Sequence, residues 1–565
     1  MKLEFLKKIK FIIPNSFNKS FFILFFFLLI NSLLEIFSIG MLLPLFEMVK
    51  DNDTKLIYFI ENFEFFNIFE KNIYNIYFIL IFLFLITFFF KTFFHIQTIK
   101  FSVNLIANLK TKLSYEIFKN YSFKDFLYFK KKNSSSIIRN LIKEISEFCD
   151  RFLLSFINLF LDLLIILCII VFLIIHTPQE LFFLVIYSFI FFFIYYFLNR
   201  KKLFNAGEQR QNLDEKKYSI LSNFLNNIKE VKILNTEKFY LEAFNSFTNK
   251  FEKTFAKFVI ISLISKPLFE LLIIIFLCLV FIIKLFLQVP LNDIIFNLSI
   301  LSLGCLRILP SISRLMFNIG QVIFSYPSIN EIYNDRSLFN SNYLSQIHKK
   351  KLIKFKTSIK FKDVSFGYEL DNYIFKNFNF EIKKGEKICI IGPSGRGKTT
   401  MVEILIGLIQ PTSGHILVDN KVFDITNEKL NLTYLTQDTM LFDDTIKNNI
   451  ILNKNFNQKK YNETIKLSLL DDFINSNIDK DFYKVGVFGN NLSGGQKQKV
   501  AFARAIYSDA ELIILDEPFT ALDDENREII KTNIFKVFQN KTVIFISHDK
   551  RLINEFDNVI EIDKL

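Results

Sequence analysis

The chain has 565 residues, a net charge of +13 and a composition that is 51% hydrophobic and 17% aromatic. This length exceeds what one hydrophobic core usually holds, so we expect two or more domains. Apolar residues crowd into the first ~330 positions, which predicts a membrane domain followed by a soluble one. Lys and Arg flank the apolar runs, as expected of side chains that meet anionic membrane lipid, and this excludes nucleic acid as a partner.

Six apolar runs are candidates for membrane spans. Crossing the ~30 Å hydrocarbon core takes about 20 helical residues. The runs lie at residues 21–47, 75–97, 153–176, 181–198, 259–287 and 293–325. Several exceed the required length, so we expect these helices to continue into the cytoplasm.

The connections between the runs alternate in charge. The N-terminal segment is basic, the loop after the first run is acidic, and residues 98–150 are again basic. By the positive-inside rule both termini are cytoplasmic. Residues 98–152 and 199–258 show helical apolar spacing and predict two cytoplasmic helical hairpins. Within the acidic loop, residues 56–69 predict either a short helix on the membrane surface or an apolar cap over the helix ends.

The polarity of the chain changes once more near residue 336. Residues 1–335 are predicted to form the transmembrane domain, and the polar segment 336–355 reads as a linker. Residues 356–565 read as a soluble α/β domain. The expected fold is a six-span α-helical transmembrane bundle followed by an α/β domain.

A glycine-rich stretch fits the phosphate-loop pattern GxxxxGK[ST] and follows the apolar strand 388–391. It consists of Gly392, Pro393, Ser394, Gly395, Arg396, Gly397, Lys398 and Thr399, and Thr400 directly after it is a further candidate ATP-binding residue. Its glycines let the backbone curl around phosphates at a helix N-terminus. Lys398 would neutralise the β- and γ-phosphates of ATP, and Thr399 would give its hydroxyl to Mg²⁺.

An acidic pair ends a second apolar run. Residues 512–515 are all apolar, as in a buried parallel strand, and Asp516 and Glu517 follow them. Asp516 would hold Mg²⁺, directly or through water, and Glu517 would polarise the attacking water. The soluble part is therefore expected to be an α/β phosphate-loop ATPase domain.

The motif Leu492-Ser493-Gly494-Gly495-Gln496, placed between the phosphate loop and this acidic pair, resembles the signature of the ATP-binding cassette (ABC) ATPases. The resemblance implies that Tyr368 stacks on adenine and that Gln437 senses Mg²⁺ and couples to the membrane domain. It implies that Asp523 links the two ATP sites and that His548 contacts the γ-phosphate. The signature residues would close over ATP bound to the opposite subunit, which implies a homodimer built from two half-transporters.

Two features depart from this family pattern. Val487 stands where the family usually carries Glu, which puts the usual contact to the membrane helices in doubt. The sequence also ends at Leu565, soon after the histidine strand, where many relatives continue with further helices.

Three less specific segments resemble the lipid-linked oligosaccharide flippases of bacterial protein glycosylation and related polysaccharide exporters. They are residues 35–44, residues 266–270 and residues 307–314. The resemblance implies a bacterial inner-membrane exporter of a lipid-linked glycan. Peptides, other lipids and drugs are the alternative cargoes. A nucleotide-gated channel is a further alternative, against which the intact Glu517 and His548 argue.

Charged side chains inside spans are costly and usually face a cavity or a partner. The basic candidates are Lys91, Lys266, Arg307 and Arg314. They would line a cavity for an anionic cargo group, pair with carboxylates or extend to a membrane interface. The candidate carboxylates are Glu35, Asp162 and Glu270.

Overall fold

The computed structural model describes residues 2–40, 73–176, 178–337, 350–369, 372–393, 395–452, 454–548 and 555–562. The chain divides into two compact units. The first comprises Met1–Lys124 and Lys131–Phe339, and the second comprises Asp125–Lys130 and Asn340–Leu565. The outer segment 56–69 and Ser394 lie outside the described residues. The same holds for most of the predicted linker, so the domain boundaries stay predictions.

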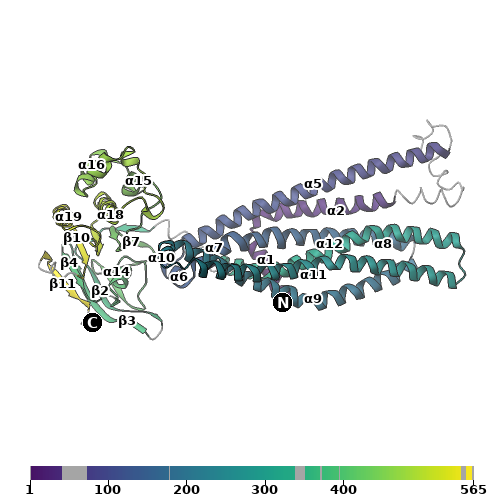
Figure 1. The fold of residues 1–565 in the computed structure, drawn as a ribbon, viewed down its shortest axis with the longest axis horizontal. Helices are drawn as coiled ribbons and strands as arrows, with labels where there is room; N and C mark the ends of the chain where they lie inside the picture. The colour runs from purple at the N-terminus through teal and green to yellow at the C-terminus, as the bar shows by residue number, and fades with distance from the viewer. Residues whose placement is uncertain are drawn as a thin grey trace. The chain divides into compact units, whose positions relative to one another are not determined.

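Long helices build the first unit (Figure 1). They are α2 (Asn18–Gly40), α5 (Ile73–Ser122), α8 (Leu154–His176), α9 (Pro178–Asn226), α11 (Glu237–Phe286) and α12 (Leu291–Ser337). Within the described part of the chain, 6 helices are long and apolar enough to cross a membrane, which confirms the predicted number of spans. α5 has 50 residues. At 1.5 Å per residue it is about 75 Å long, far more than the ~30 Å core requires.

Shorter helices complete this unit. α1 (Lys2–Ile12) precedes α2, and α10 (Ile228–Ile233) joins α9 to α11. α7 (Ser134–Arg139) follows α5, and π-helical turns at Asn140–Glu144 and Glu147–Leu153 lead into α8. α6 (Phe126–Lys131), between α5 and α7 in the sequence, groups with the second unit except for its last residue. Both polar stretches between spans are therefore helical, as predicted.

Buried ion pairs hold the charged parts of these helices together. Arg210 on α9 is only 1% exposed, and its Nη2 lies 3.1 Å from the Glu144 carboxylate. Asp214, one turn further along α9, lies 3.7 Å from Nη1 of the same guanidinium. A buried charge is tolerated when it is paired in this way, so a polar sequence folds here into a packed bundle.

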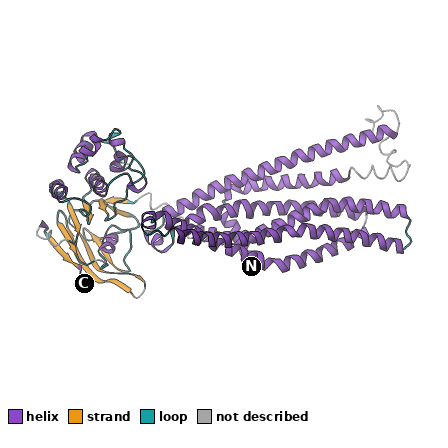
Figure 2. Ribbon diagram, viewed as in Figure 1, coloured by secondary structure: helices purple, strands orange, loops and turns teal. Residues whose placement is uncertain are grey.

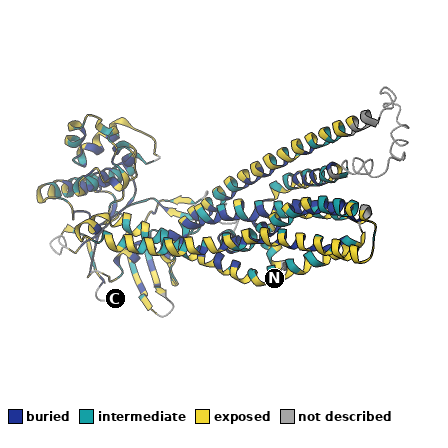
Figure 3. Ribbon diagram, turned by 45° about the vertical axis from the view of Figure 1, so that its right-hand side comes forward, coloured by how far each residue is buried: buried dark blue, intermediate teal, exposed yellow. Residues whose placement is uncertain are grey.

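The backbones of α9 and α12 touch at Gly207. A Cβ atom added there would lie 2.2 Å from the carbonyl oxygen of Phe324 on α12. The Phe324 ring stacks on Phe258 of α11 with ring centres 4.2 Å apart, so three helices meet at this level. Apolar side chains such as Phe189 (65% exposed) cover the outward faces of the helices, where we expect lipid, and Figure 3 shows these faces as exposed.

The described residues of the second unit form three sheets. Figure 2 shows their strands in orange. A parallel five-stranded sheet has the order β11-β4-β10-β9-β8, an antiparallel four-stranded sheet has the order β3-β2-β5-β6, and β1 pairs with β7. The strands are β1 (Lys351–Ile353), β2 (Ser358–Glu369), β3 (Asn372–Lys383), β4 (Lys387–Ile391), β5 (Ser413–Val418), β6 (Lys421–Val422), β7 (Glu428–Leu430), β8 (Leu432–Leu435), β9 (Leu512–Asp516), β10 (Thr542–Ile546) and β11 (Asn558–Glu561).

Helices accompany these sheets. They are α14 (Lys398–Leu405), α15 (Ile446–Ile451), α16 (Gln458–Leu467), α17 (Asp471–Ser476), α18 (Gly494–Ser508) and α19 (Asp524–Val537). Every residue of β9 and β10 is buried, as expected of parallel strands covered on both faces. Ile546 pairs with both Ile390 and Asp516, so the carboxyl ends of β4, β9 and β10 lie at one edge of the sheet. The predicted α/β phosphate-loop domain is confirmed.

Candidate functional site

The phosphate loop connects the end of β4 to the start of α14. Gly397 caps α14 with a φ of 90°, and an added Cβ would lie 2.5 Å from Ile374 and 2.8 Å from the Phe375 ring. Only glycine fits this left-handed and crowded position. Gly397 has no side chain with which to cap the helix, so the first backbone N–H groups of α14 can donate to phosphate oxygens.

Lys398 is the first residue of α14 and is 8% exposed. Its Nζ donates to the carbonyl oxygens of Gly392 and Pro393 in its own loop. The same Nζ lies 3.3 Å from His548 Nε2. The phosphate-loop lysine and the predicted γ-phosphate histidine therefore share one site.

Glu517 joins this pair. It follows β9 directly, and its Oε1 lies 2.9 Å from His548 Nε2. The same histidine nitrogen thus faces an ammonium donor and a carboxylate acceptor. It can accept from Lys398 as a neutral imidazole or donate to Glu517 when protonated. Three residues predicted from separate motifs are in contact here.

Asp516 ends β9 and is buried with 6% exposure. The Tyr434 hydroxyl on β8 donates to its Oδ2 at 3.0 Å. Burial is the main cause that raises the pKa of Asp516 above its usual value, the hydrogen bond from Tyr434 opposes it, and the nearby Glu517 adds to the rise. Sequence reasoning missed Tyr434, because the contact runs between neighbouring strands far apart in the chain.

These residues fit a magnesium–nucleotide complex. The predicted Mg²⁺ ligands are the Thr399 hydroxyl, the Asp516 carboxylate and the Gln437 amide, all oxygen donors of the kind Mg²⁺ prefers. Among the described residues no group of three His, Cys, Asp or Glu side chains could hold a metal. Mg²⁺ is usually held by one or two carboxylates together with substrate phosphates, so this donor set is sufficient. Gln437 is exposed in the segment after β8.

A polar cluster surrounds the predicted adenine tyrosine. The Tyr368 hydroxyl lies 3.3 Å from Thr400 Oγ1 and 3.3 Å from Glu403 Oε2, both on α14. Lys130, which groups with the second unit, donates to the Tyr368 hydroxyl at 3.0 Å and to both Glu403 oxygens at 2.8 Å. Lys130 and Glu403 were not predicted as site residues, since neither belongs to a recognisable motif.

The signature begins α18. Ser493 caps this helix, accepting from the backbone N–H of Gln496 at 3.3 Å while the Gln496 side chain accepts from the Ser493 N–H at 2.8 Å. A Cβ on Gly495 would lie 3.1 Å from the Ala521 carbonyl oxygen. Gln496 therefore serves as part of a capping box. Asp523 caps α19, and its carboxylate accepts from the Asn526 side chain at 2.6 Å.

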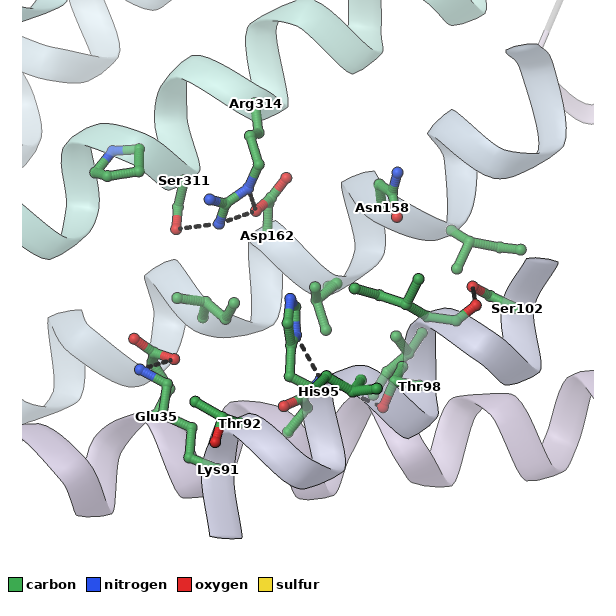
Figure 4. Close-up of a pocket in the computed structure, with 18 of the residues that line it drawn as sticks. Glu35, Lys91, Thr92, His95, Thr98, Ser102, Asn158, Asp162, Ser311 and Arg314 are labelled. Carbon is green, nitrogen blue, oxygen red and sulfur yellow. Dashed lines mark hydrogen bonds and ion pairs between the residues drawn. The ribbon is translucent and has the colours of Figure 1, made fainter. Parts of the chain in front are cut away.

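A polar pocket of about 1010 Å³ lies in the first unit between α2, α5, α8 and α12. Its charged and ring-nitrogen side chains are Glu35, Lys91, His95, Asp162, Arg307 and Arg314. Lys91 lies 2.7 Å and Arg307 lies 3.5 Å from Glu35. Arg314 lies 2.8 Å from Asp162 (Figure 4). Lys91, Arg307 and Arg314 therefore line a cavity and also pair with carboxylates. These two roles, which the sequence left open, do not exclude each other.

Lys266 lies elsewhere. It is on α11, its side chain is 63% exposed, and its Nζ lies 3.9 Å from Glu270 one turn away. It does not line the polar pocket. Its proposed role in a cavity stays a prediction without support from this pocket.

The second unit holds a phosphate loop beside a strand that ends in an acidic residue, and the described part of the first unit contains six candidate spans. Together these features define the chain as a membrane-embedded P-loop ATP-binding protein. Residues 375–520 match the family described as ABC transporter. Residues 21–303 match the family described as ABC transporter transmembrane region, which covers half of the chain. The chain belongs to the ABC transporters, and the resemblance inferred from its signature is confirmed at this level.

Two curated relatives each match over little more than a third of this chain. The chain is 35% identical over 212 residues to the "Beta-(1-->2)glucan export ATP-binding/permease protein NdvA" of Rhizobium etli, covering 37% of this chain and 36% of that protein. It is 36% identical over 211 residues to the "Lacticin-481/lactococcin-DR transport/processing ATP-binding protein lcnDR3" of Lactococcus lactis, covering 36% of this chain and 30% of that protein. The matched region is thus about a third of the length of these relatives.

One solved structure shares the fold over nearly the whole chain. It is described as "Structure of a bacterial Atm1-family ABC exporter with ATP bound" and aligns with a TM-score of 0.76. The alignment covers 97% of this chain and 94% of that chain at 17% sequence identity. This similarity confirms the exporter-type fold.

Proposed function

We propose that the chain is an ATP-driven exporter that moves a lipid-linked oligosaccharide or a related glycolipid outward across a bacterial inner membrane, with both termini in the cytoplasm. The observation that carries the cargo assignment is the polar pocket. Three basic side chains face two carboxylates there, beside apolar walls that include Leu28 and Ile157. A cavity with an excess of cations and apolar walls suits an amphipathic molecule with an anionic group.

The ion pairs explain how such a pocket tolerates its charges. Glu35 is shared between Lys91 and Arg307, so neither cation is left without a partner inside the membrane. A pyrophosphate group carries more negative charge than one carboxylate and would replace Glu35 as the partner of both cations. Exchange of one anion for another avoids the large cost of exposing a bare charge to the bilayer interior.

In this proposal each residue of the nucleotide site has a role. The N–H groups at the start of α14 and the Lys398 ammonium would hold the phosphates, and Glu517 would orient and polarise the attacking water. His548, within 2.9 Å of Glu517, would position the terminal phosphate beside that water. A bound Mg²⁺, held by Thr399, Gln437 and Asp516, would neutralise charge that develops on the phosphates.

A homodimer is part of this proposal. The Ser493 side chain and the N-terminus of α18 form a second anion-binding helix end that belongs to the signature. In a head-to-tail pair of chains, this helix end would close over ATP held by the phosphate loop of the other copy. The shared fold with an ABC exporter over 97% of the chain supports the arrangement.

Export of peptide, another lipid or a drug is the alternative. A relative described as a lacticin transport/processing protein favours the peptide alternative, and one described as a glucan export protein favours a glycan.

The deciding experiment is ATP-dependent translocation of a pyrophosphate-linked oligosaccharide lipid in proteoliposomes that contain the full chain. We expect transport by the wild type, none by Glu517→Gln, and loss of transport with retained basal ATP hydrolysis in Arg307→Ala. Lys266→Ala is the matched control, because it removes a span cation outside the polar pocket. Robust ATP hydrolysis without glycolipid movement would reject this cargo and leave the alternatives, and normal transport by Arg307→Ala would reject the role of the pocket cations.

A further inference from the structure

A second cavity, of about 630 Å³, opens between α1, α9 and α12. We call it the aromatic pocket. Its walls carry the rings of Phe5, Tyr196, Phe197, Phe204 and Tyr326. Two cations, Arg200 and Lys201, also line it. It has no side chain in common with the polar pocket.

Ring contacts fix the walls of the aromatic pocket. Tyr326 on α12 stacks on Phe5 of α1 with ring centres 5.7 Å apart, and its ring centre lies 5.8 Å from that of Phe204 on α9. α1 is held against α12 by Lys8, whose Nζ donates to the Asn330 side chain at 3.0 Å. The cavity is therefore built by three packed elements and has the volume of a ligand site.

The two cations of this pocket differ from the three cations of the polar pocket. Lys91, Arg307 and Arg314 each pair with a carboxylate. Among the described residues, neither Arg200 nor Lys201 has a carboxylate within ion-pair distance. The Arg200 guanidinium lies 5.9 Å from the centre of the Tyr196 ring. Both side chains are exposed and free to meet an external anion.

These cations lie where we expect the edge of the membrane along the helices. The apolar run 181–198 of α9 ends directly before them. The Tyr195 hydroxyl donates to the Ile261 carbonyl oxygen on the antiparallel α11, which sets the two helices in register. Five residues beyond Tyr195 on α9 lies Arg200, and four residues before Ile261 on α11 lies Lys257. Both helices thus turn from apolar to basic at the same level, as expected at a membrane–water interface.

We propose that the aromatic pocket binds an anionic phospholipid of the leaflet on the side of α1, which is the cytoplasmic leaflet in the orientation proposed above. The lipid phosphate lies between Arg200 and Lys201, and an acyl chain lies along the rings of Phe197, Phe204 and Tyr326. Unpaired cations beside an apolar cavity at the interface are complementary to such a headgroup and chain. This site is separate from the cargo pocket and does not depend on the identity of the cargo.

The absence of Trp from the chain gives a site-specific test. Phe204→Trp places a single fluorophore in the aromatic pocket of the full-length protein, which is reconstituted in phosphatidylcholine vesicles. An equal fraction of brominated phosphatidylglycerol or brominated phosphatidylcholine is then included as the quencher. Each basic residue near the surface strengthens anionic-lipid binding about fivefold. We therefore expect the pocket to bind phosphatidylglycerol more tightly than phosphatidylcholine by a factor on the order of ten or more.

The controls distinguish binding in this pocket from a general attraction of anionic lipid to the basic surface of the helices. Arg200→Gln/Lys201→Gln should abolish the preference. Lys202→Gln/Lys257→Gln removes two exposed cations of the same interfacial belt that do not line the pocket, and it should retain the preference. Added inorganic phosphate should not relieve the quenching. Native mass spectrometry of the chain without the Trp reporter should show the same preferential retention of phosphatidylglycerol.

Three results would overturn the proposal. Equal quenching by the two lipids would show that the pocket does not select an anion. An equal loss of the preference for phosphatidylglycerol in both double variants would show that it arises from all basic residues at this interface and not from the pocket. Relief by inorganic phosphate would assign an oxyanion site in place of a lipid site.

Discussion

Glu517 has a left-handed backbone, with φ at 47°, directly after the fully buried strand β9. Such a conformation is strained for a residue with a Cβ and persists where the surroundings impose it, often at functional sites. Here the backbone N–H of Glu517 donates to the Ile546 carbonyl oxygen at 3.0 Å, which fixes the residue beside β10. The carboxylate is thereby held next to His548.

We expect Glu517→Gln to lower the steady-state rate of ATP hydrolysis by about 10²–10⁴-fold, the usual contribution of a general base. The amide keeps the shape of the side chain but cannot take a proton from water. ATP binding should persist, measured by retention of labelled nucleotide. Glu525→Gln, an exposed carboxylate in the first turn of α19, is the control and should hydrolyse ATP normally. Normal turnover by Glu517→Gln would show that another group is the base.

Tyr434 donates a hydrogen bond to Asp516 and so favours its ionised form. Burial raises the pKa of Asp516, and the hydrogen bond from the Tyr434 hydroxyl lowers it again. Tyr434→Phe removes this opposing contribution, so the pKa rises further and the carboxyl keeps its proton to a higher pH. Since Mg²⁺ requires the ionised carboxylate, the acid limb of the pH–ATPase profile should move to higher pH. An unchanged acid limb at saturating Mg²⁺ and ATP would show that Asp516 does not limit activity there.

The residues of the nucleotide site differ in how well the sequence predicts them. Lys398, Glu517 and His548 follow strands that lie side by side in a parallel sheet, so motif spacing was sufficient to bring them together. Tyr434 and Glu403 reach the site from neighbouring elements, and no local pattern distinguishes them from core residues. Their roles depend on strand order and helix packing, which are properties of the folded chain.

At the scale of elements, apolar run length predicted the six long helices because a lipid-facing helix must be apolar over its whole span. The same signal does not predict where a polar helix ends or where a π-helical turn interrupts it. The turns at Asn140–Glu144 and Glu147–Leu153 carry Glu144 and Glu147, which pair with Arg210 on another helix. These features are set by tertiary ion pairs that a single sequence does not reveal.

The contact between α9 and α12 can be tested at Gly207. Gly207→Ala places a methyl group 2.2 Å from the Phe324 carbonyl oxygen, so the two helices must separate. We expect a loss of about 1–3 kcal/mol, the usual cost of overpacking, seen as a lower Tm in detergent. Gly40→Ala is the control, because a Cβ there meets nothing within 4 Å. An unchanged Tm in Gly207→Ala would show that α9 and α12 are not tightly packed at this level.

At the scale of the whole molecule, the proposed homodimer makes each ATP site from two chains. One copy would supply the phosphate loop with Lys398, and the other would supply the signature with Ser493. Lys398→Ala removes the cation of the first half-site. Ser493→Asp keeps a good helix cap but adds a negative charge opposite the phosphates, so it should inactivate the second half-site without unfolding α18.

Differently tagged chains that are co-expressed and purified through both tags distinguish shared sites from sites within one chain. If the sites are shared, a dimer with Lys398→Ala on one copy and Ser493→Asp on the other keeps one intact site and should hydrolyse ATP. A dimer with both substitutions on one copy and a wild-type partner should then be inactive, because each site contains one damaged half. Sites contained within one chain give the opposite pattern, since the wild-type partner would keep its own complete site. ATP hydrolysis by the two purified dimers therefore decides whether the signature acts across the subunit interface.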